Sequence, residues 1–135
     1  MRVEFVIKGK PVAKARPRVL KSGITYTPKK TKDYEELVQQ VYKLQVGEYL
    51  GESALLCEID FYFSIPKSYS KKRKQAIIEG EELYTKKPDL DNLAKTITDA
   101  LNGVAYKDDS QIIEMKLKKR YSPEDKVVVA IEELF

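Results

Sequence analysis

The sequence predicts an α+β fold in which helices pack on a mixed β-sheet within a single compact domain. Segments with strand-like alternation and segments with helical spacing of apolar residues follow one another in mixed order. That order is strand, short strand, helix, strand, two helices and two closing strands. No repeat, low-complexity tract or linker divides the chain, and 135 residues is the size of one domain. We therefore expect residues 1–135 to form one domain.

The first half predicts a strand, a basic arm and a long helix. Apolar and charged residues alternate over residues 3–7, which indicates a half-buried strand. Residues 9–23 hold two prolines and two glycines among basic residues and are expected to form an extended, irregular arm. A short strand around 24–27 precedes a helix over about residues 31–49, with Thr31 as its N-cap. The apolar residues expected to form its buried face are Tyr34, Leu37, Val38, Val41 and Leu44.

The second half predicts the centre of the sheet and its closing strands. Apolar residues alternate over residues 55–65, and the opposite face is also partly apolar, so we expect a central strand that ends at Pro66. A short basic helix capped by Ser70 is predicted next. After a second helix, strands are expected at about residues 111–121 and 126–134.

Composition excludes several classes of enzyme. The chain has no histidine, which excludes a histidine general base, a histidine-oriented nucleophile and a histidine-bearing zinc site. The single cysteine, Cys57, falls on the apolar side of a predicted strand and is expected to be a buried hydrophobe rather than a catalytic thiol. No signal peptide and no apolar run long enough to span a bilayer occurs, so we expect a cytoplasmic protein without membrane association.

Cations are concentrated in two stretches of a chain whose net charge is +4. Nine Lys or Arg residues and no acid lie between Lys8 and Lys32, and five more lie between Lys67 and Lys74. Such clusters are typical either of a phosphate-binding surface or of a solvated basic face. A further cationic row on the strand after the acidic turn admits the same two interpretations. The candidate DNA contacts are Lys10, Lys14, Arg16, Arg18, Lys87, Lys116 and Lys118.

Acid is concentrated between Lys87 and Gln111, where the sequence reads KPDLDNLAKTITDALNGVAYKDDSQ. Pro88 favours an extended entry into a helix that ends at Asn102 and Gly103. The spacing i, i+4, i+8 places three charged residues on one face of that helix, away from its apolar stripe. These residues are Asp91, Lys95 and Asp99.

Two interpretations of the aspartates remain open on residues alone. In the structural one, Asp89 or Asp91 caps the helix, and Asp108 and Asp109 are solvated turn residues. In the functional one, the turn folds back so that Asp109 meets Asp89 and Asp91. A hard divalent cation would relieve the repulsion among the gathered carboxylates, and Mg²⁺ prefers such oxygen ligands, with Mn²⁺ as an alternative.

The run KPDLDNLAKTITDALNG followed by YKDDSQI resembles the RusA family of Holliday junction resolvases. These are small endodeoxyribonucleases, often carried by prophages, that cut four-way DNA junctions. The basic arm GKPVAKARPR and the region from Tyr26 to Tyr34 are also similar to the family, so the resemblance covers essentially the whole chain.

The resemblance implies particular roles for the aspartates. Asp89, Asp91 and Asp109 would be the essential metal-binding carboxylates, and Lys95 a catalytic or DNA-contacting residue. Asp108, a further candidate metal ligand, and Asp99 match positions that are acidic in the family. The resemblance also implies a compact mixed α/β domain that dimerises, with its acidic sites in a basic DNA-binding face.

The resulting hypothesis is a Mg²⁺-dependent homodimeric endonuclease that binds branched DNA and resolves four-way junctions by symmetric cleavage, in recombination and repair. The homodimer follows from the two-fold symmetry of a junction, although the sequence does not indicate which surface pairs the subunits. The alternatives are a nuclease for other branched or single-stranded DNA and a non-catalytic nucleic-acid-binding protein. The number of metal ions and any sequence preference at the cut site are left open.

Overall fold

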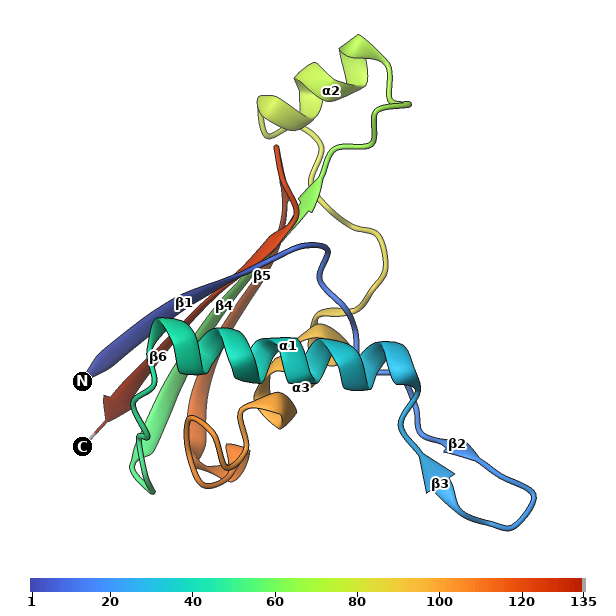
Figure 1. Cartoon of the computed structure of the whole chain (residues 1–135). Helices are drawn as coiled ribbons and strands as arrows, with labels where there is room; N and C mark the ends of the chain where they lie inside the picture. Colours follow the sequence, from blue (N-terminus) through green and yellow to red (C-terminus); the bar gives the residue numbers. More distant parts are fainter. Residues whose placement is uncertain (135) are drawn as a thin grey trace.

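The computed structural model describes residues 1–134 and consists of a four-stranded mixed sheet with helices on one face (Figure 1). The strand order is β1-β6-β4-β5, in which β4 pairs antiparallel with β6 and parallel with β5. The strands are β1 (Arg2–Lys8), β4 (Ala54–Ser64), β5 (Ile112–Ser122) and β6 (Lys126–Leu134). The predicted α+β class and the central position of the 55–65 segment are confirmed.

Helices α1 (Lys29–Gln45) and α3 (Leu90–Ala100) pack side by side on the sheet and bury its apolar face (Figure 1). Cys57 belongs to this core at 1% exposure, and burial raises the pKa of its thiol to about 12, so the predicted unreactive role is confirmed. The largest fully buried side chains come from strands, from both helices and from the segment after α3: Phe5, Ile7, Val38, Tyr42, Leu55, Ile59, Phe61, Leu93, Ile97, Leu101, Tyr106 and Ile131.

The expected buried face of α1 was partly wrong. Leu37 is 40% exposed and Leu44 is 87% exposed. The helix begins at Lys29, after Pro28, and its buried stripe rises in steps of three and four residues that miss both leucines. The buried residues of the stripe are Thr31, Tyr34, Val38 and Tyr42. Thr31, which was expected to be the N-cap, is therefore a buried residue inside the helix. The N-cap is Pro28.

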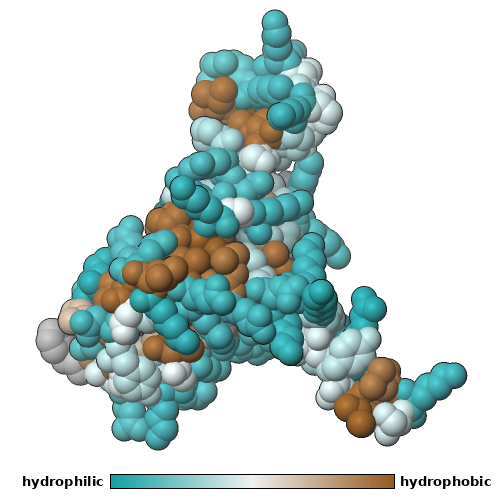
Figure 2. All heavy atoms as spheres, viewed as in Figure 1, coloured by the Kyte–Doolittle hydropathy of each residue, from teal (hydrophilic) through white to brown (hydrophobic). Residues whose placement is uncertain are grey.

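Two basic extensions project from opposite sides of this body (Figure 1). Helix α2 (Lys71–Ile78) stands beyond one end of the sheet, and the side chain of Ser70 caps it as predicted. Part of the arm expected to be irregular forms a small hairpin of β2 (Arg18–Val19) and β3 (Thr25–Tyr26). Figure 2 shows apolar residues at the hairpin's end, where the exposed large side chains are Val19, Leu20 and Ile24.

Strand β5 carries an irregularity that the sequence did not indicate. Leu55 pairs with Ile112 and Leu56 with Glu114, so Ile113 has no pairing partner on β4. This bulge explains why Ile113 is 70% exposed although it lies in an apolar alternation. Among the helices of residues 1–134, none combines the length and apolar character that crossing a lipid bilayer requires.

Candidate active site

Helix α3 positions the acidic segment by burying one of its faces. Leu93, Ile97 and Leu101 are at most 1% exposed, so the opposite face carries the charged residues predicted from spacing. Asp89 precedes the helix in an extended conformation, with φ −71° and ψ 147°. This agrees with the extended entry into the helix that was expected at Pro88. Its side chain makes no capping hydrogen bond, and both Asp89 and Asp91 are exposed.

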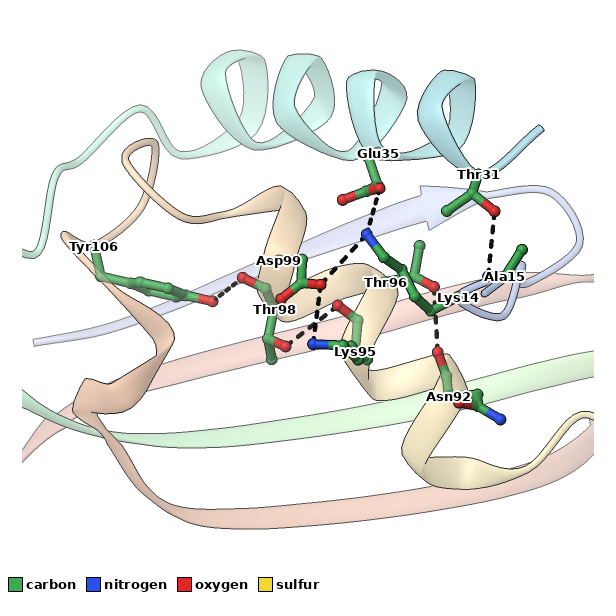
Figure 3. A network of polar contacts seen from close by, with 10 residues as sticks. All are labelled: Lys14, Ala15, Thr31, Glu35, Asn92, Lys95, Thr96, Thr98, Asp99 and Tyr106. Carbon is green, nitrogen blue, oxygen red and sulfur yellow. Dashed lines mark hydrogen bonds and ion pairs between the residues drawn. The ribbon is translucent and has the colours of Figure 1, made fainter. Parts of the chain in front are cut away.

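A network of ion pairs fixes the middle of this face (Figure 3). The ammonium of Lys14 lies 2.9 Å from the Glu35 carboxylate and 3.4 Å from that of Asp99. Lys95, one turn before Asp99, contacts the same carboxylate oxygen at 3.3 Å. The backbone N–H of Lys14 also donates to the Asn92 carbonyl at 2.9 Å, which ties the basic arm to α3. Asp99 therefore joins the arm, α1 and α3.

Asp109 completes this cluster from a different part of the chain. It begins the short 3₁₀ helix η1 (Asp109–Gln111), and its backbone N–H donates to the Asn102 side chain at 2.8 Å. Its carboxyl neighbours that of Asp99. Burial, followed by the negative charges of Asp108 and Asp99, raises the pKa of Asp109, and Lys95 opposes the shift. A raised pKa with two neighbouring carboxyl groups is an arrangement that added positive charge would stabilise.

Asp108 has a structural task in the same turn. Its side chain accepts a hydrogen bond from the Ser110 N–H at 3.3 Å, and the Gln111 side chain accepts one from the Asp108 N–H at 2.8 Å. This reciprocal capping box holds η1, and the hydrogen bonds from Ser110 lower the pKa of Asp108. The structural interpretation of Asp108 is thus supported, whereas its proposed role as a metal ligand is a prediction.

Asp109 does not form a three-carboxylate group with Asp89 and Asp91 among the described residues. It lies beside Asp99 in the last turns of α3, whereas Asp89 precedes the helix and Asp91 lies in its first turn. Within residues 1–134, no three acidic or cysteine side chains gather closely enough to hold a metal ion together. The physical reason is the anchor of the turn, because the Asn102 side chain holds Asp109 at the C-terminal end of α3.

A basic groove of about 640 Å³ opens beside the N-terminal end of α3. Lys10, Arg16 and Arg18, three of the candidate DNA contacts, line it, and among residues 1–134 no acidic side chain does. Lys14 also lines the groove, but its side chain is only 18% exposed and is engaged by two carboxylates. It therefore serves the ion-pair network. Pro88 forms part of the wall, so the groove adjoins the entry to the acidic helix.

The remaining predicted DNA contacts are distributed differently. Lys87 is exposed in the segment that leads into α3. Lys116 and Lys118 lie on the other face of the sheet, opposite Glu58 and Asp60 of β4, and Lys116 approaches Glu58 at 3.9 Å. That cationic row does not lie beside the acidic helix, because alternate residues of β5 face away from α3. The interpretation as a solvated strand face therefore fits the row better.

Sequence reasoning missed one residue that organises the site, Lys119, and the bridging role of another, Asp99. The ammonium of Lys119 donates to the carbonyls of Lys86 and Pro88, at 2.8 and 3.1 Å, and so fastens the entry segment of α3 to β5. Its position on the apolar-facing side of an alternating strand was a signal that could have identified it. Asp99 was found as part of the charged face, but its bridging role depends on tertiary contacts with Lys14 and Asp109.

We expect Lys119→Met to loosen the entry segment of α3 without unfolding the sheet. The variant keeps the packing volume but loses two charge-assisted hydrogen bonds to backbone carbonyls. Trypsin should cleave after Lys86 several times faster in the variant than in the wild type. Lys118→Met, from the neighbouring exposed position, is the matched control and should digest at the wild-type rate. Equal rates for both variants would show that Lys119 does not hold the segment.

The fold and site define a class of protein: a basic α+β domain that holds a carboxylate–lysine cluster beside an acid-free cationic groove. The family model described as endodeoxyribonuclease RusA matches residues 8–132. The chain therefore belongs to the RusA family, as its resemblance implied, and membership implies endodeoxyribonuclease activity. The chain is also similar to the uncharacterized protein YqaN of Bacillus subtilis strain 168. The two are 36% identical, over 98% of this chain and 96% of the relative.

RusA nucleases are generally dependent on a divalent metal. Mg²⁺ binds carboxylate oxygens and usually takes one or two of them together with water and substrate phosphate. Asp109 and the neighbouring Asp99 supply such a pair, and burial, followed by the negative charges of Asp108 and Asp99, raises the pKa of Asp109. The chemistry of the donors fits a divalent metal, although the trio expected from the sequence is not assembled.

Proposed function

We propose that this protein is a divalent-metal-dependent endonuclease that resolves four-way DNA junctions. The observation that carries the proposal is the adjacency of two surfaces of opposite charge. The acid-free groove shares the segment around Pro88 with the acidic helix, so a phosphate backbone lying in the groove would pass the carboxylates of α3. Family membership supports nuclease chemistry.

The metal ligands that we propose are Asp109, Asp91 and Asp89, which form no three-carboxylate group among the described residues and would have to move together around the preferred ion, Mg²⁺. Asp108 is an additional candidate ligand. A divalent cation bound there supplies charge neutralisation of the phosphodiester and an activated water. Lys95 is exposed and anchored to Asp99 at 3.3 Å, so its ammonium is held next to the carboxylates, where it can stabilise negative charge on a phosphate. Lys14 neutralises Asp99 from the other side and orients it as a positioning residue.

Symmetric cleavage requires two such sites related by a two-fold axis. A four-way junction has approximate two-fold symmetry, so a homodimer would present one active site to each of two opposed strands. Within one protomer the acidic cluster occurs once, at α3 and η1. We therefore propose that the active species on a junction is a homodimer acting in recombination and repair.

The test is a comparison of three DNA substrates of equal length and sequence content: a four-way junction, a replication fork and a linear duplex. We expect paired nicks in opposed strands of the junction when Mg²⁺ is present and none in EDTA, with Mn²⁺ also supporting cleavage. The linear duplex should be left uncut under the same conditions. Preferential cleavage of the fork would instead assign the protein to other branched DNA, and binding without any strand scission would make it a non-catalytic binding protein.

A further inference from the structure

The segment that connects α2 to α3 runs past one end of the sheet (Figure 1). A second cavity, of about 300 Å³, is lined by residues of this segment and of strands β4 and β5. Its walls include three tyrosines from separate parts of the chain: Tyr69 precedes α2, Tyr84 follows it and Tyr121 belongs to β5. Two lysines, Lys10 and Lys86, also line it. The cavity thus combines aromatic faces with positive charge.

The aromatic rings are held in fixed positions. Tyr84 stacks on Phe63 with ring centroids 4.3 Å apart and meets the Tyr121 ring edge-on at 4.9 Å. The Arg73 guanidinium lies 3.6 Å from the Tyr69 ring centroid and is itself bonded at 3.1 Å to Glu82. Rings that are already ordered lose little conformational entropy when a flat ligand stacks on them.

The charges at the cavity favour an anionic ligand. The ammonium of Lys86 donates to the Tyr69 hydroxyl and lies 4.8 Å from that ring's centroid. Asp125, the acidic residue of the lining, is engaged by Ser64, whose backbone N–H donates to it at 2.7 Å. Among the ion pairs of residues 1–134, none involves Lys10 or Lys86, so both positive charges can act on a phosphate at the cavity's edge, that of Lys86 from beside the Tyr69 hydroxyl.

The cavity is continuous with the proposed DNA path. Lys10 lines both the aromatic cavity and the basic groove. On the other side, Lys86 lines the cavity and Pro88 lines the groove, and Asp89 follows directly at the start of α3. Lys119 fastens this shared wall to β5 through the Lys86 and Pro88 carbonyls. A nucleotide in the cavity would therefore contact the chain segment that leads directly into the acidic helix.

We propose that this cavity binds a nucleobase that is unstacked at the branch point of DNA, with the adjoining phosphates on Lys10 and Lys86. The proposal deepens the proposed function and rests on it. Aromatic side chains stack on any base, so such a site recognises an opened structure rather than a sequence. The energetic cost of extruding a base is least where pairing is already disrupted, as it is at a branch. The cavity would thereby favour junctions over linear duplex.

The experiment measures equilibrium affinity in EDTA, so that DNA is bound but not cut. The wild type, Tyr69→Ala and Tyr69→Phe are each titrated with an intact four-way junction, the same junction carrying abasic nucleotides at the branch point, and a linear duplex. We expect Tyr69→Ala to bind the intact junction about tenfold more weakly, whereas Tyr69→Phe, which keeps the ring, stays within about twofold of the wild type. All three proteins should bind linear duplex equally.

The abasic junction supplies the decisive comparison. The wild type should lose about tenfold on it, and Tyr69→Ala should lose nothing further, because ring and base act as one pair. The cavity proposal would be overturned if the wild type bound the abasic junction as tightly as the intact one. It would also be overturned if the affinity losses from Tyr69→Ala and from the abasic nucleotides were additive. Neither result would affect the nuclease proposal. A wild type that does not prefer junction to duplex would overturn both. The wild-type arm requires no variant and is valid even if Tyr69→Ala folds poorly.

Discussion

Replacing Asp109 by Asn is expected to reduce junction cleavage by about a thousandfold and to leave junction affinity unchanged or slightly improved. The amide preserves the shape of the side chain but removes the charge that would hold a divalent cation. Asp109 also lies within a basic protein, so neutralising it removes repulsion toward DNA phosphates. Cleavage rates are measured with the variant in excess over a labelled junction, and affinity is measured separately in EDTA.

The same substitution should make the metal-free protein slightly more stable. Burial and the carboxylates of Asp108 and Asp99 raise the pKa of Asp109 in the folded state. A raised carboxyl pKa means that ionisation costs stability above that pKa, and the cost disappears below the unfolded value of about 3.9. We expect the melting temperature of Asp109→Asn to exceed that of the wild type at pH 7, and the difference to shrink as the pH falls.

Added Mg²⁺ separates catalysis from folding in this experiment. It should raise the melting temperature of the wild type, because a ligand that binds only the folded state stabilises it, and should leave Asp109→Asn unchanged. Asp60→Asn is the matched control, since Asp60 pairs with Arg120 at 3.3 Å on the other face of the sheet. That variant should cleave at the wild-type rate. An inactive Asp109→Asn that also melts well below the wild type would attribute the lost cleavage to unfolding.

The sequence predicted which residues belong to this site better than it predicted how they are arranged. Spacing along one helix is a local property, so the shared face of Lys95 and Asp99 was predictable and is confirmed by the contact between them. The position of Asp109 depends on a side chain seven residues earlier, Asn102, which accepts its N–H. Nothing in the spacing distinguishes that turn from one that folds back to Asp89.

The same distinction between local and tertiary information applies to the fold. Strand alternation and the capping role of Ser70 are local, and both were predicted within a few residues of their observed bounds. The parallel pairing of β4 with β5, the bulge at Ile113 and the burial of Lys14 between Glu35 and Asp99 each require knowledge of neighbours distant in sequence. Charge patterning alone therefore assigned Lys14 to the DNA surface.

Replacing Arg16 and Arg18 together by Gln is expected to weaken junction binding by about 10- to 100-fold at low salt. Both side chains are exposed in the acid-free groove, and neither has a carboxylate partner among the ion pairs of residues 1–134. Each cation that contacts a phosphate releases about one counterion on binding, so the slope of log affinity against log salt should fall in magnitude by about two. Affinities at four or more salt concentrations measure the slope.

The matched control neutralises two exposed lysines elsewhere, Lys43→Gln and Lys107→Gln. Lys43 lies thirteen residues along α1 from Lys30 of the groove, about 20 Å away, and Lys107 pairs with Glu52. This variant has the same net charge as the arginine variant, so equal losses in both would reveal a general charge effect instead of a groove. A reduced slope confined to the arginine variant would place the phosphate backbone in the groove. DNA there lies beside Pro88 and the start of α3, which is where the proposed cleavage requires it.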